Sequence, residues 1–591
     1  MKNESLLVKF LIWRIKYIRD KTFVLILAGI IGLISGIAAV TLKESVHLIQ
    51  HLLINDFEVE YANYLYLSYP LIGIILTYLV AKYIFRENLG HGITAILYSI
   101  SKKSSIISRT KMISRMVTSA LTVGFGGSVG LEAPIAVTGS AIGSNVGRSM
   151  HLNYKKRTIL IGCGAAGAIS AIFNSPVAGV IFALEVMLSE VTLAGFIPVL
   201  IASVSASLIS LGLLGDDVLF SFKLKDSFAA SDTIFYIGLG LISGLVSVYF
   251  TRVTFKIEGI INKVNSGPGK VFVGGIGLGL IIFVFPPIYG EGYQTIKLLL
   301  AGKDTEVLNS SLFFSQVENI SLILLFLVGV ILIKPVASAA TIGAGGSGGI
   351  FAPSLFLGGI LGFVYSSGYN VFFNGTISVS NFTLVGMCGV MSGVLHAPLT
   401  AMFLIAEITS GYELFVPLML VAAIAYSTST FFEKHSLYTK HLIERGDLIK
   451  YDKDRQVLSL IDLKKIVEKD LLQIGPEAKL GELVDLVKVS KRNIFPVVND
   501  FGELVGVITL DDIRDVMFDN EKRNSVFVNS LMRTPPAHVA PSEEMESVMS
   551  KFEVTNAWNL PVIDEGRYIG FISKSRIFNT YRKKLIRQNK E

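Results

Sequence analysis

The chain has 591 residues, a mean hydropathy of +0.59, 51% hydrophobic residues and only 17% charged residues. This composition excludes an ordinary soluble globular protein and predicts a polytopic membrane protein. The formal net charge of +7 comes from short basic stretches that are typical of inward-facing loops and tails, so it does not indicate a nucleic-acid-binding protein. Of the 99 charged residues, 48 lie after residue 440. A membrane body followed by a soluble module is therefore expected, with the boundary near 435–460.

Residues 1–20 are expected to form an amphipathic helix on the cytoplasmic membrane surface. Basic residues alternate with apolar ones, which does not fit a cleaved signal peptide. The apolar residues recur at helical spacing: Leu6, Leu7, Phe10, Leu11 and Ile15. The two cysteines, Cys163 and Cys388, lie in apolar segments, so neither a disulfide framework nor a metal site is expected.

Residues 21–435 are expected to form the membrane domain, in two halves at about 21–215 and 230–435. A helix needs about 20 apolar residues to cross the hydrocarbon core. Candidate stretches lie at roughly 22–42, 63–85, 158–188, 192–214, 233–252, 270–290, 318–340, 346–366, 382–408 and 412–432. Glycine and proline interrupt several of them, which predicts short, tilted or broken helices. Broken backbone at membrane depth is tolerated where protein or a water-filled cavity covers it, so it indicates a translocation path.

The membrane body contains an internal repeat. The phrase "GFGGSVGLEAPIAVTGSAIG" (124–143) matches "GAGGSGGIFAPSLFLGGILG" (343–362), and the two begin 219 residues apart. A second phrase, "GAISAIFNSPVAGVIFALE" (167–185), matches "GVMSGVLHAPLTAMFLIAE" (389–407), 222 residues later. Two membrane halves descended from one unit predict a transporter whose site lies at the interface of the halves.

The first repeated phrase predicts two helix starts, at 130–134 and 349–353. In each, glycines precede Ala-Pro and an apolar run, and proline is favoured in the first turn of a helix. A helix start presents unpaired N–H groups and the positive end of a dipole to an anion. Two such starts in mid-membrane would hold an anion without a buried lysine or arginine, and weakly enough for it to leave again.

Glu132 is the single ionisable residue of the first phrase, and Phe351 takes its place in the second. A carboxylate at a helix start is itself an anion, so it can occupy the site when the substrate is absent. Once protonated, it would move away and open the path. The alternative is a helix-capping glutamate with no moving part.

These phrases resemble the signatures of the CLC family of chloride channels and proton–chloride exchangers, and the resemblance runs from about residue 20 to the end. The signatures appear as "GHGIT" (90–94), "GLEAP" (130–134) and "GGIFAP" (348–353). The resemblance implies a mostly α polytopic membrane protein with two inverted-repeat halves, broken helices and a small α/β cytoplasmic tail. It also implies a homodimer with one anion pore per subunit.

The resemblance further implies a chloride ion held by the N–H groups of Ile350 and Phe351 and by the hydroxyl of Tyr438, with Glu132 as the outer gate. The first signature usually carries a serine where this chain has His91. Because an imidazole can donate a hydrogen bond, His91 and Gly92 are expected to contribute to the chloride site and to make conduction pH-dependent. The alternative is a neutral histidine packed beside the path.

The mechanism depends on Glu185 and Val186. Many exchangers of the family have two adjacent glutamates here, of which the second passes protons from the inside. Valine cannot relay a proton, so a gated chloride channel with voltage- or pH-dependent opening is favoured. The alternative is a proton–chloride exchanger whose proton route uses Glu132 and Glu185. Glu185 has a structural alternative too, because Glu407 occupies the same place in the other half.

The tail has a repeat of its own, in which "FPVVNDFGELVGVITLDDI" (495–513) matches "LPVIDEGRYIGFISKSRI" (560–577). Each copy predicts a strand, a turn, a second strand and a helix start, and a helix is expected before each copy. The pattern resembles a pair of CBS domains. The expected boundaries are a linker at 436–465, CBS domains at 466–526 and 527–585, and a basic tail at 586–591.

CBS pairs can bind adenine nucleotides through a Thr or Ser after the strand and an Asp three residues later. Thr509 and Asp512 fit this pattern, as does Ser573, but Arg576 replaces the second Asp. A purely structural tail is the alternative, and no cofactor is required.

Two other classes are disfavoured. A CBS-bearing cation transporter would need clusters of Asp and Glu in mid-membrane, and the apolar stretches lack them. Helix N-termini also repel cations. An enzyme would need a catalytic constellation, and the tail has no P-loop, Ser/His/Asp arrangement or Cys/His cluster. A multi-pass plasma-membrane protein is expected, with cytoplasmic N-terminus and tail. Its partners would be chloride and similar anions, the bilayer and, for an exchanger, protons.

Overall fold

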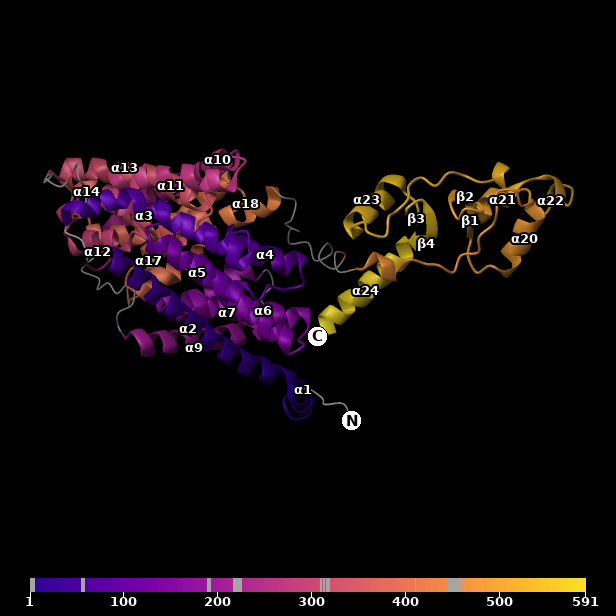
Figure 1. Cartoon of the computed structure of the whole chain (residues 1–591), viewed down its shortest axis with the longest axis horizontal. Helices are drawn as coiled ribbons and strands as arrows, with labels where there is room; N and C mark the ends of the chain where they lie inside the picture. Colours follow the sequence, from indigo (N-terminus) through magenta and orange to yellow (C-terminus); the bar gives the residue numbers. More distant parts are fainter. Residues whose placement is uncertain are drawn as a thin grey trace. The chain divides into compact units, whose positions relative to one another are not determined.

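The computed structural model describes residues 6–54, 59–188, 193–215, 226–308, 311, 314, 319–409, 411–444, 458 and 461–590. The chain divides into two compact units, Met1–Leu448 and Ile449–Glu591. The first unit is helical and the second combines helices with two small sheets (Figure 1). This confirms the predicted fold class.

The helices of the first unit are α1 Leu6–Tyr17, α2 Asp20–Ile54, α3 Val59–Leu79, α4 Gly92–Lys102, α5 Lys111–Gly124, α6 Glu132–Ser149, α7 Tyr154–Phe173, α8 Pro176–Phe182, α9 Leu193–Leu214, α10 Thr233–Asn262, α11 Gly267–Val284, α12 Tyr293–Ala301, α13 Ile320–Gly343, α14 Phe351–Phe373, α15 Val379–Leu395, α16 Pro398–Ile408, α17 Phe415–Phe432 and α18 Leu437–Glu444. Short π-helical turns follow α3 and α8, and 3-10 turns occur at 230–232, 286–288 and 305–308. Over the described ranges, nine helices are long and apolar enough to cross a membrane.

The predicted broken helices are present. The apolar stretch 158–188 breaks between α7 and α8, where Asn174 adopts a left-handed conformation and Pro176 starts the next helix. The stretch 382–408 breaks in the same way between α15 and α16, at His396 and Pro398. At each break a proline follows two residues after the residue in the left-handed conformation and fits the first turn of the new helix, so both breaks follow from local sequence.

Besides α1, five described helices of the first unit lie outside the predicted apolar stretches: α4, α5, α6, α12 and α18. The longest two, α5 and α6, do so because small and polar residues fill them. Nearly all of α6 is buried in protein, so it needs no apolar outer surface. Glycine lets it pack closely on α7, since a Cβ on Gly139 would lie 2.0 Å from the carbonyl oxygen of Gly164. In the other half, a Cβ on Gly358 of α14 would lie 2.3 Å from the carbonyl oxygen of Gly386 of α15.

The first and last helices of the first unit can be compared with the predicted domain boundaries. Helix α1 falls within the predicted N-terminal helix, and its Arg14 is buried over the ring of Phe23, 4.1 Å from the centroid. The linker expected from residue 436 begins later, because Leu437–Glu444 forms α18, which packs on α4 through its buried residues. Residues 445–457 and 459–460 of that expected linker lie outside the described residues.

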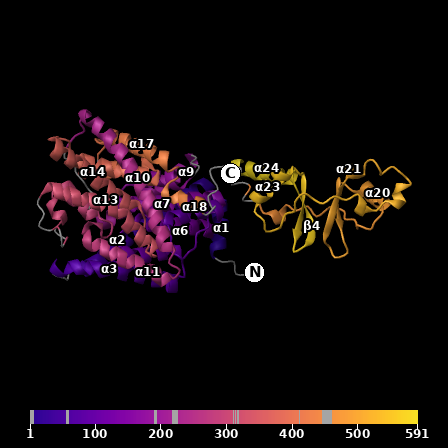
Figure 2. The same ribbon diagram turned by 90° about the horizontal axis from the view of Figure 1, so that it is seen from above.

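The second unit contains two copies of one motif (Figure 2). Antiparallel hairpins form from β1 Ile494–Val498 with β2 Leu504–Thr509 and from β3 Asn559–Asp564 with β4 Arg567–Ser573. The helices are α20 Leu480–Val489, α21 Leu510–Ile513, α22 Lys522–Ser525, α23 Met545–Thr555 and α24 Lys574–Lys590. The hairpins meet where the N–H of Tyr568 donates to the carbonyl of Gly502 at 2.9 Å. Helix α24 continues past the expected boundary at 585, so residues 586–590 end a helix.

Candidate functional site

The two predicted helix starts meet at the centre of the first unit. Helix α6 begins at Glu132 and α14 at Phe351. Just before them, Gly130 and Gly349 exchange a pair of backbone hydrogen bonds, each 2.9 Å long. The two halves of the repeat therefore present their helix starts side by side, and the N–H groups of each first turn have no acceptor within the helix.

The loops before these helices are held by a second swapped pair of bonds. The N–H of Ser128 donates to the hydroxyl of Thr341 at 3.2 Å, and the N–H of Ser347 donates to the hydroxyl of Thr122 at 3.0 Å. Each loop is thus supported by the helix that precedes its counterpart in the other half. This exchange gives the centre an approximate twofold symmetry.

Glu132 breaks that symmetry chemically. Its side chain is 1% exposed, and its Oε1 accepts a 2.6 Å hydrogen bond from the hydroxyl of Tyr293. Its Oε2 has no hydrogen-bond partner among the described residues. The carboxylate folds back over its own loop, since a Cβ built on Gly130 would lie 2.0 Å from Oε2. Glycine at this position is what leaves room for the carboxylate.

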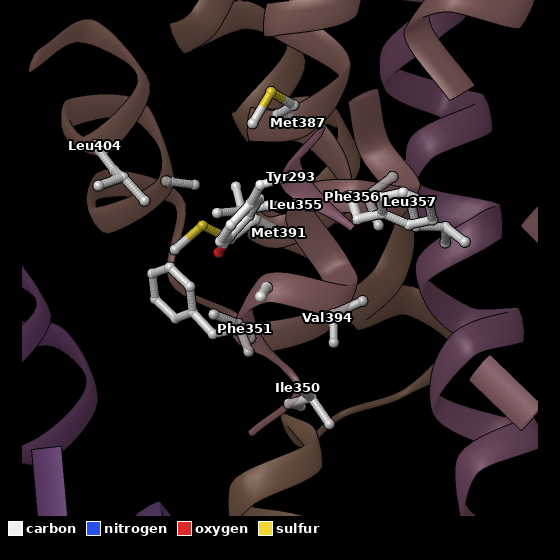
Figure 3. Packing of buried hydrophobic residues seen from close by; sticks show 14 of the residues in the cluster. Tyr293, Ile350, Phe351, Leu355, Phe356, Leu357, Met387, Met391, Val394 and Leu404 are labelled. Atoms are coloured by element: carbon white, nitrogen blue, oxygen red, sulfur yellow. The ribbon is translucent and has the colours of Figure 1, made fainter. Parts of the chain in front are cut away.

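The other half has Phe351 in the corresponding position, within the apolar core drawn in Figure 3. Ile350 and Phe351 are each 1% exposed. The ring of Phe351 stacks on Phe173 at 5.4 Å and meets Phe182 edge-on at 6.2 Å. The start of α14 is therefore apolar apart from its backbone N–H groups, which suits a weakly hydrated anion.

Tyr438 joins this centre from α18. It is 3% exposed, and its hydroxyl has no hydrogen-bond partner among the described residues. Its carbonyl accepts a 3.1 Å bond from the hydroxyl of Thr94 on α4, which begins at Gly92. Its phenol and the carboxylate of Glu132 are close enough to interact electrostatically. A buried hydroxyl without a partner is costly and calls for a ligand or water.

His91 precedes α4, and its side chain has partners that sequence reasoning missed. Its Nε2 lies 3.1 Å from Oε2 of Glu258 on α10, and its ring stacks on that of His441 at 4.0 Å. The side chain of His91 is mostly buried. The imidazole is therefore engaged with a carboxylate. No sequence signal singled out Glu258, which lies in the last turns of a long helix.

A buried lysine also lies near the centre. Lys334 of α13 is 0% exposed and donates to the hydroxyl of Ser128 at 2.9 Å and to two carbonyls at 3.3 Å. It interacts electrostatically with Glu291, whose Oε1 accepts from the N–H of Leu131 at 3.2 Å. Glu291 in turn interacts with Glu132. The available signal was that Lys334 is the single charged residue of α13.

Glu185 and Glu407 form another swapped pair. Glu185 follows α8 and accepts from the N–H groups of Leu399 and Thr400 at 3.1 and 2.8 Å, and from the Thr400 hydroxyl at 2.6 Å. Glu407 on α16 accepts from the first N–H groups of α8 at 3.0 and 2.8 Å. Each carboxylate caps the helix start of the opposite half, the favourable position for a negative charge. The neighbouring Val186 is half-buried.

Comparison with known proteins agrees with this architecture. A family model described as voltage gated chloride channel matches residues 72–430, and a CBS domain model matches 463–519 and 528–583. The chain belongs to the CLC family of voltage-gated chloride channels. Chloride transport is thus its activity, as the signatures predicted.

The relatives and solved structures are distant in sequence. The chain is 26% identical to a ClcB-like chloride channel protein of Ralstonia nicotianae, over 72% of this chain and 97% of the relative. It is 25% identical to the chloride channel protein CLC-f of Arabidopsis thaliana, over 73% of this chain and 61% of that protein. The fold matches a slow cyanobacterial Cl⁻/H⁺ antiporter, with a TM-score of 0.62, 22% identity, and coverage of 74% of this chain and 100% of the other. It also matches a eukaryotic CLC transporter, with a TM-score of 0.59, 16% identity, and coverage of 94% and 97%.

In the CBS pair of this CLC chain, the residues predicted to bind a nucleotide are hydrogen-bonded to other protein groups. Asp512 accepts from the N–H and hydroxyl of Thr509 at 2.9 and 2.7 Å and pairs with Arg533 at 2.6 Å. Ser573 ends β4 as Thr509 ends β2, and its hydroxyl donates to Glu468 at 2.7 Å. Thr509 and Asp512 thus cap α21, and a ribose would compete with these internal bonds.

Proposed function

We propose that this CLC protein is a gated chloride channel in which the carboxylate of Glu132 closes the anion path and its protonation opens it. The observation that carries the proposal is the position of that carboxylate. It is buried where two helix starts meet, accepts a hydrogen bond from Tyr293, and interacts with the backbone N–H of Ala352 in the first turn of α14. A carboxylate there competes with chloride for the same positive backbone groups.

The chloride ligands we propose are the N–H groups of Ile350 and Phe351 and the hydroxyl of Tyr438. The support is that these N–H groups begin α14 and that the hydroxyl is buried without another acceptor or donor. Gly92 would contribute the start of α4. His91 would contribute only when its bond to Glu258 is broken, because a carboxylate beside the path repels an anion.

The alternative is a proton–chloride exchanger, and one observation favours it. Glu291 is partly buried and interacts electrostatically with both Lys334 and Glu132. These residues would offer a proton route that avoids Val186. Against it, Glu185 is committed to three hydrogen bonds at the start of α16, so the residue expected to relay protons acts as a cap.

We further propose that the protein works as a homodimer in the plasma membrane, with both the basic α1 and the CBS pair in the cytoplasm. The support for this orientation is the rule that inward-facing loops and tails are basic. The protein would transport rather than catalyse, and it would need no cofactor. An adenine nucleotide at Thr509, Asp512 and Ser573 would regulate transport only by displacing the internal bonds of that site.

The deciding experiment uses purified protein in liposomes, with a chloride gradient and an external pH electrode. Chloride efflux without proton movement supports the channel. Efflux that drives protons uphill, and that stops when Glu132 is replaced by Gln, supports the exchanger. Folded protein that passes no chloride would contradict both.

A further inference from the structure

Three side chains that can bind a metal lie together at the N-terminal end of α4. They are His91, which precedes α4, Glu258 of α10 and His441 of α18. Their ligand atoms all lie within 4.8 Å of one another. Oε2 of Glu258 is 3.1 Å from Nε2 of His91 and 3.5 Å from Nε2 of His441. The side chains are mostly buried, with exposed fractions of 12%, 9% and 13% in that order.

The two distances from Oε2 of Glu258 fit ligands of one tetrahedral metal ion. Zinc binds imidazole nitrogen and carboxylate oxygen at about 2.0–2.2 Å, so two ligands of one ion lie roughly 3.3 Å apart. The 3.1 and 3.5 Å separations from Glu258 bracket that value, and the histidine nitrogens lie within 4.8 Å of each other. Two histidines and one carboxylate are also the donor set of open zinc sites, in which a fourth position takes water or another ligand.

The second observation concerns Glu258 alone. Its carboxylate is nine-tenths buried, and its Oε1 has no hydrogen-bond partner among the described residues. A buried carboxylate oxygen without a partner is costly, and a cation bound beside it would remove that cost. The opposing rings pack on their neighbours, since His441 lies against Phe255 at 4.3 Å and stacks on His91 at 4.0 Å. Because a metal lies in the plane of each imidazole that binds it, the two rings would turn out of this stack to share one ion.

The helices that carry the donors are tied together beside them. Glu433 pairs with Lys440 of α18 at 2.8 Å and with Arg252 of α10 at 2.8 Å. Helix α18 also packs on α4, where Thr94 donates to the carbonyl of Tyr438. His441 thus lies three residues after the tyrosine that we assign to the chloride site, on one short helix.

We propose that His91, Glu258 and His441 bind a divalent cation of the zinc class, and that its binding inhibits chloride flux. The inhibition rests on the proposed function. A metal bridging α4, α10 and α18 would fix the elements around Tyr438, and its positive charge would retain an anion that must leave for conduction to continue. The expectation of no metal site rested on the two cysteines alone. His91, Glu258 and His441 lie far apart in sequence, so no local pattern brought them together.

Zinc binding is measured first, by calorimetry on the purified full chain in detergent. About one zinc per chain is expected, and affinity should fall at least tenfold in His91→Ser, Glu258→Gln and His441→Gln, because loss of even an outer-sphere partner costs 10–100-fold. His538→Gln is the matched control, since His538 is an exposed histidine of the CBS pair. Size-exclusion chromatography checks folding, and His441→Gln provides a second test if Glu258→Gln does not fold. Unchanged binding in the folded triad variants would overturn the site.

Chloride flux is then measured in liposomes with and without zinc. The quantity compared is the flux with zinc divided by the flux without zinc for the same protein. Zinc should reduce flux several-fold in the wild type and the His538→Gln control, and should have little effect in Glu258→Gln and His441→Gln. Binding that depends on the triad but leaves wild-type flux unchanged would overturn the inhibition. A wild type that binds zinc but passes no chloride even without metal would instead contradict the proposed function.

Discussion

Replacing Tyr293 with Phe tests the gate most directly, because it removes one hydroxyl and keeps the ring. That hydroxyl donates a 2.6 Å hydrogen bond to Oε1 of Glu132. A hydrogen bond to a charged group contributes about 1.5–3 kcal/mol. The bond stabilises the ionised, closed carboxylate, so its loss shifts the equilibrium towards the protonated, open form.

At about 1.36 kcal/mol per pH unit, the half-maximal flux of Tyr293→Phe should move up by roughly 1–2 pH units. Chloride efflux from liposomes, measured across a series of pH values, gives the midpoint. Tyr289→Phe is the matched control, because its hydroxyl makes only a 3.4 Å contact with the carbonyl of Gly124. A midpoint that does not move, or that moves down, in folded Tyr293→Phe protein would refute the reasoning.

The other predictions concern the gate, the swapped caps and the buried lysine. Glu132→Gln should keep or raise chloride flux and abolish its pH dependence, whereas flux that collapses together with thermal stability would make the residue structural. Glu185→Gln and Glu407→Gln should each lower the free energy of unfolding by about 1–2 kcal/mol, because each replaces charge-assisted hydrogen bonds with neutral ones. The two melting temperatures should fall by similar amounts, and a large fall in only one variant would argue against equivalent caps. Lys334→Met should lower the free energy of unfolding by about 1–3 kcal/mol, because it removes the buried donor to Ser128 and one of the cations that interact with Glu291. Adding Glu291→Gln should recover part of that loss in thermal unfolding, and no recovery would mean that the two side chains are not coupled.

Local sequence was sufficient for the features that depend on neighbouring residues. The Ala-Pro phrases predicted where α6 and α14 begin, and the prolines predicted the breaks before α8 and α16. Alternating apolar residues and turn glycines predicted both hairpins of the CBS pair. Each of these features is decided within a few residues, by a missing N–H or by the period of the side chains.

The side-chain partners of the site could not be predicted in this way. Tyr293 and Glu132 are 161 positions apart, and His91 and Glu258 are 167 positions apart. Nothing in either neighbourhood indicates its partner, because the pairing depends on how the helices pack. Lys334 was not singled out either, although a lysine within an apolar helix is a functional signal by itself. Tertiary contact decides which polar residues meet, whereas local pattern decides only which segments carry them.

The exchanged bonds between the halves have a consequence for biosynthesis. When the ribosome has delivered only the first half to the bilayer, the start of α8 still lacks Glu407, and Gly130 lacks Gly349. Those polar groups lack their final hydrogen-bond partners until more than 200 further residues have been translated. The first half is therefore an unfinished insertion intermediate, and mutations that reshape one half would select for compensating changes in the other.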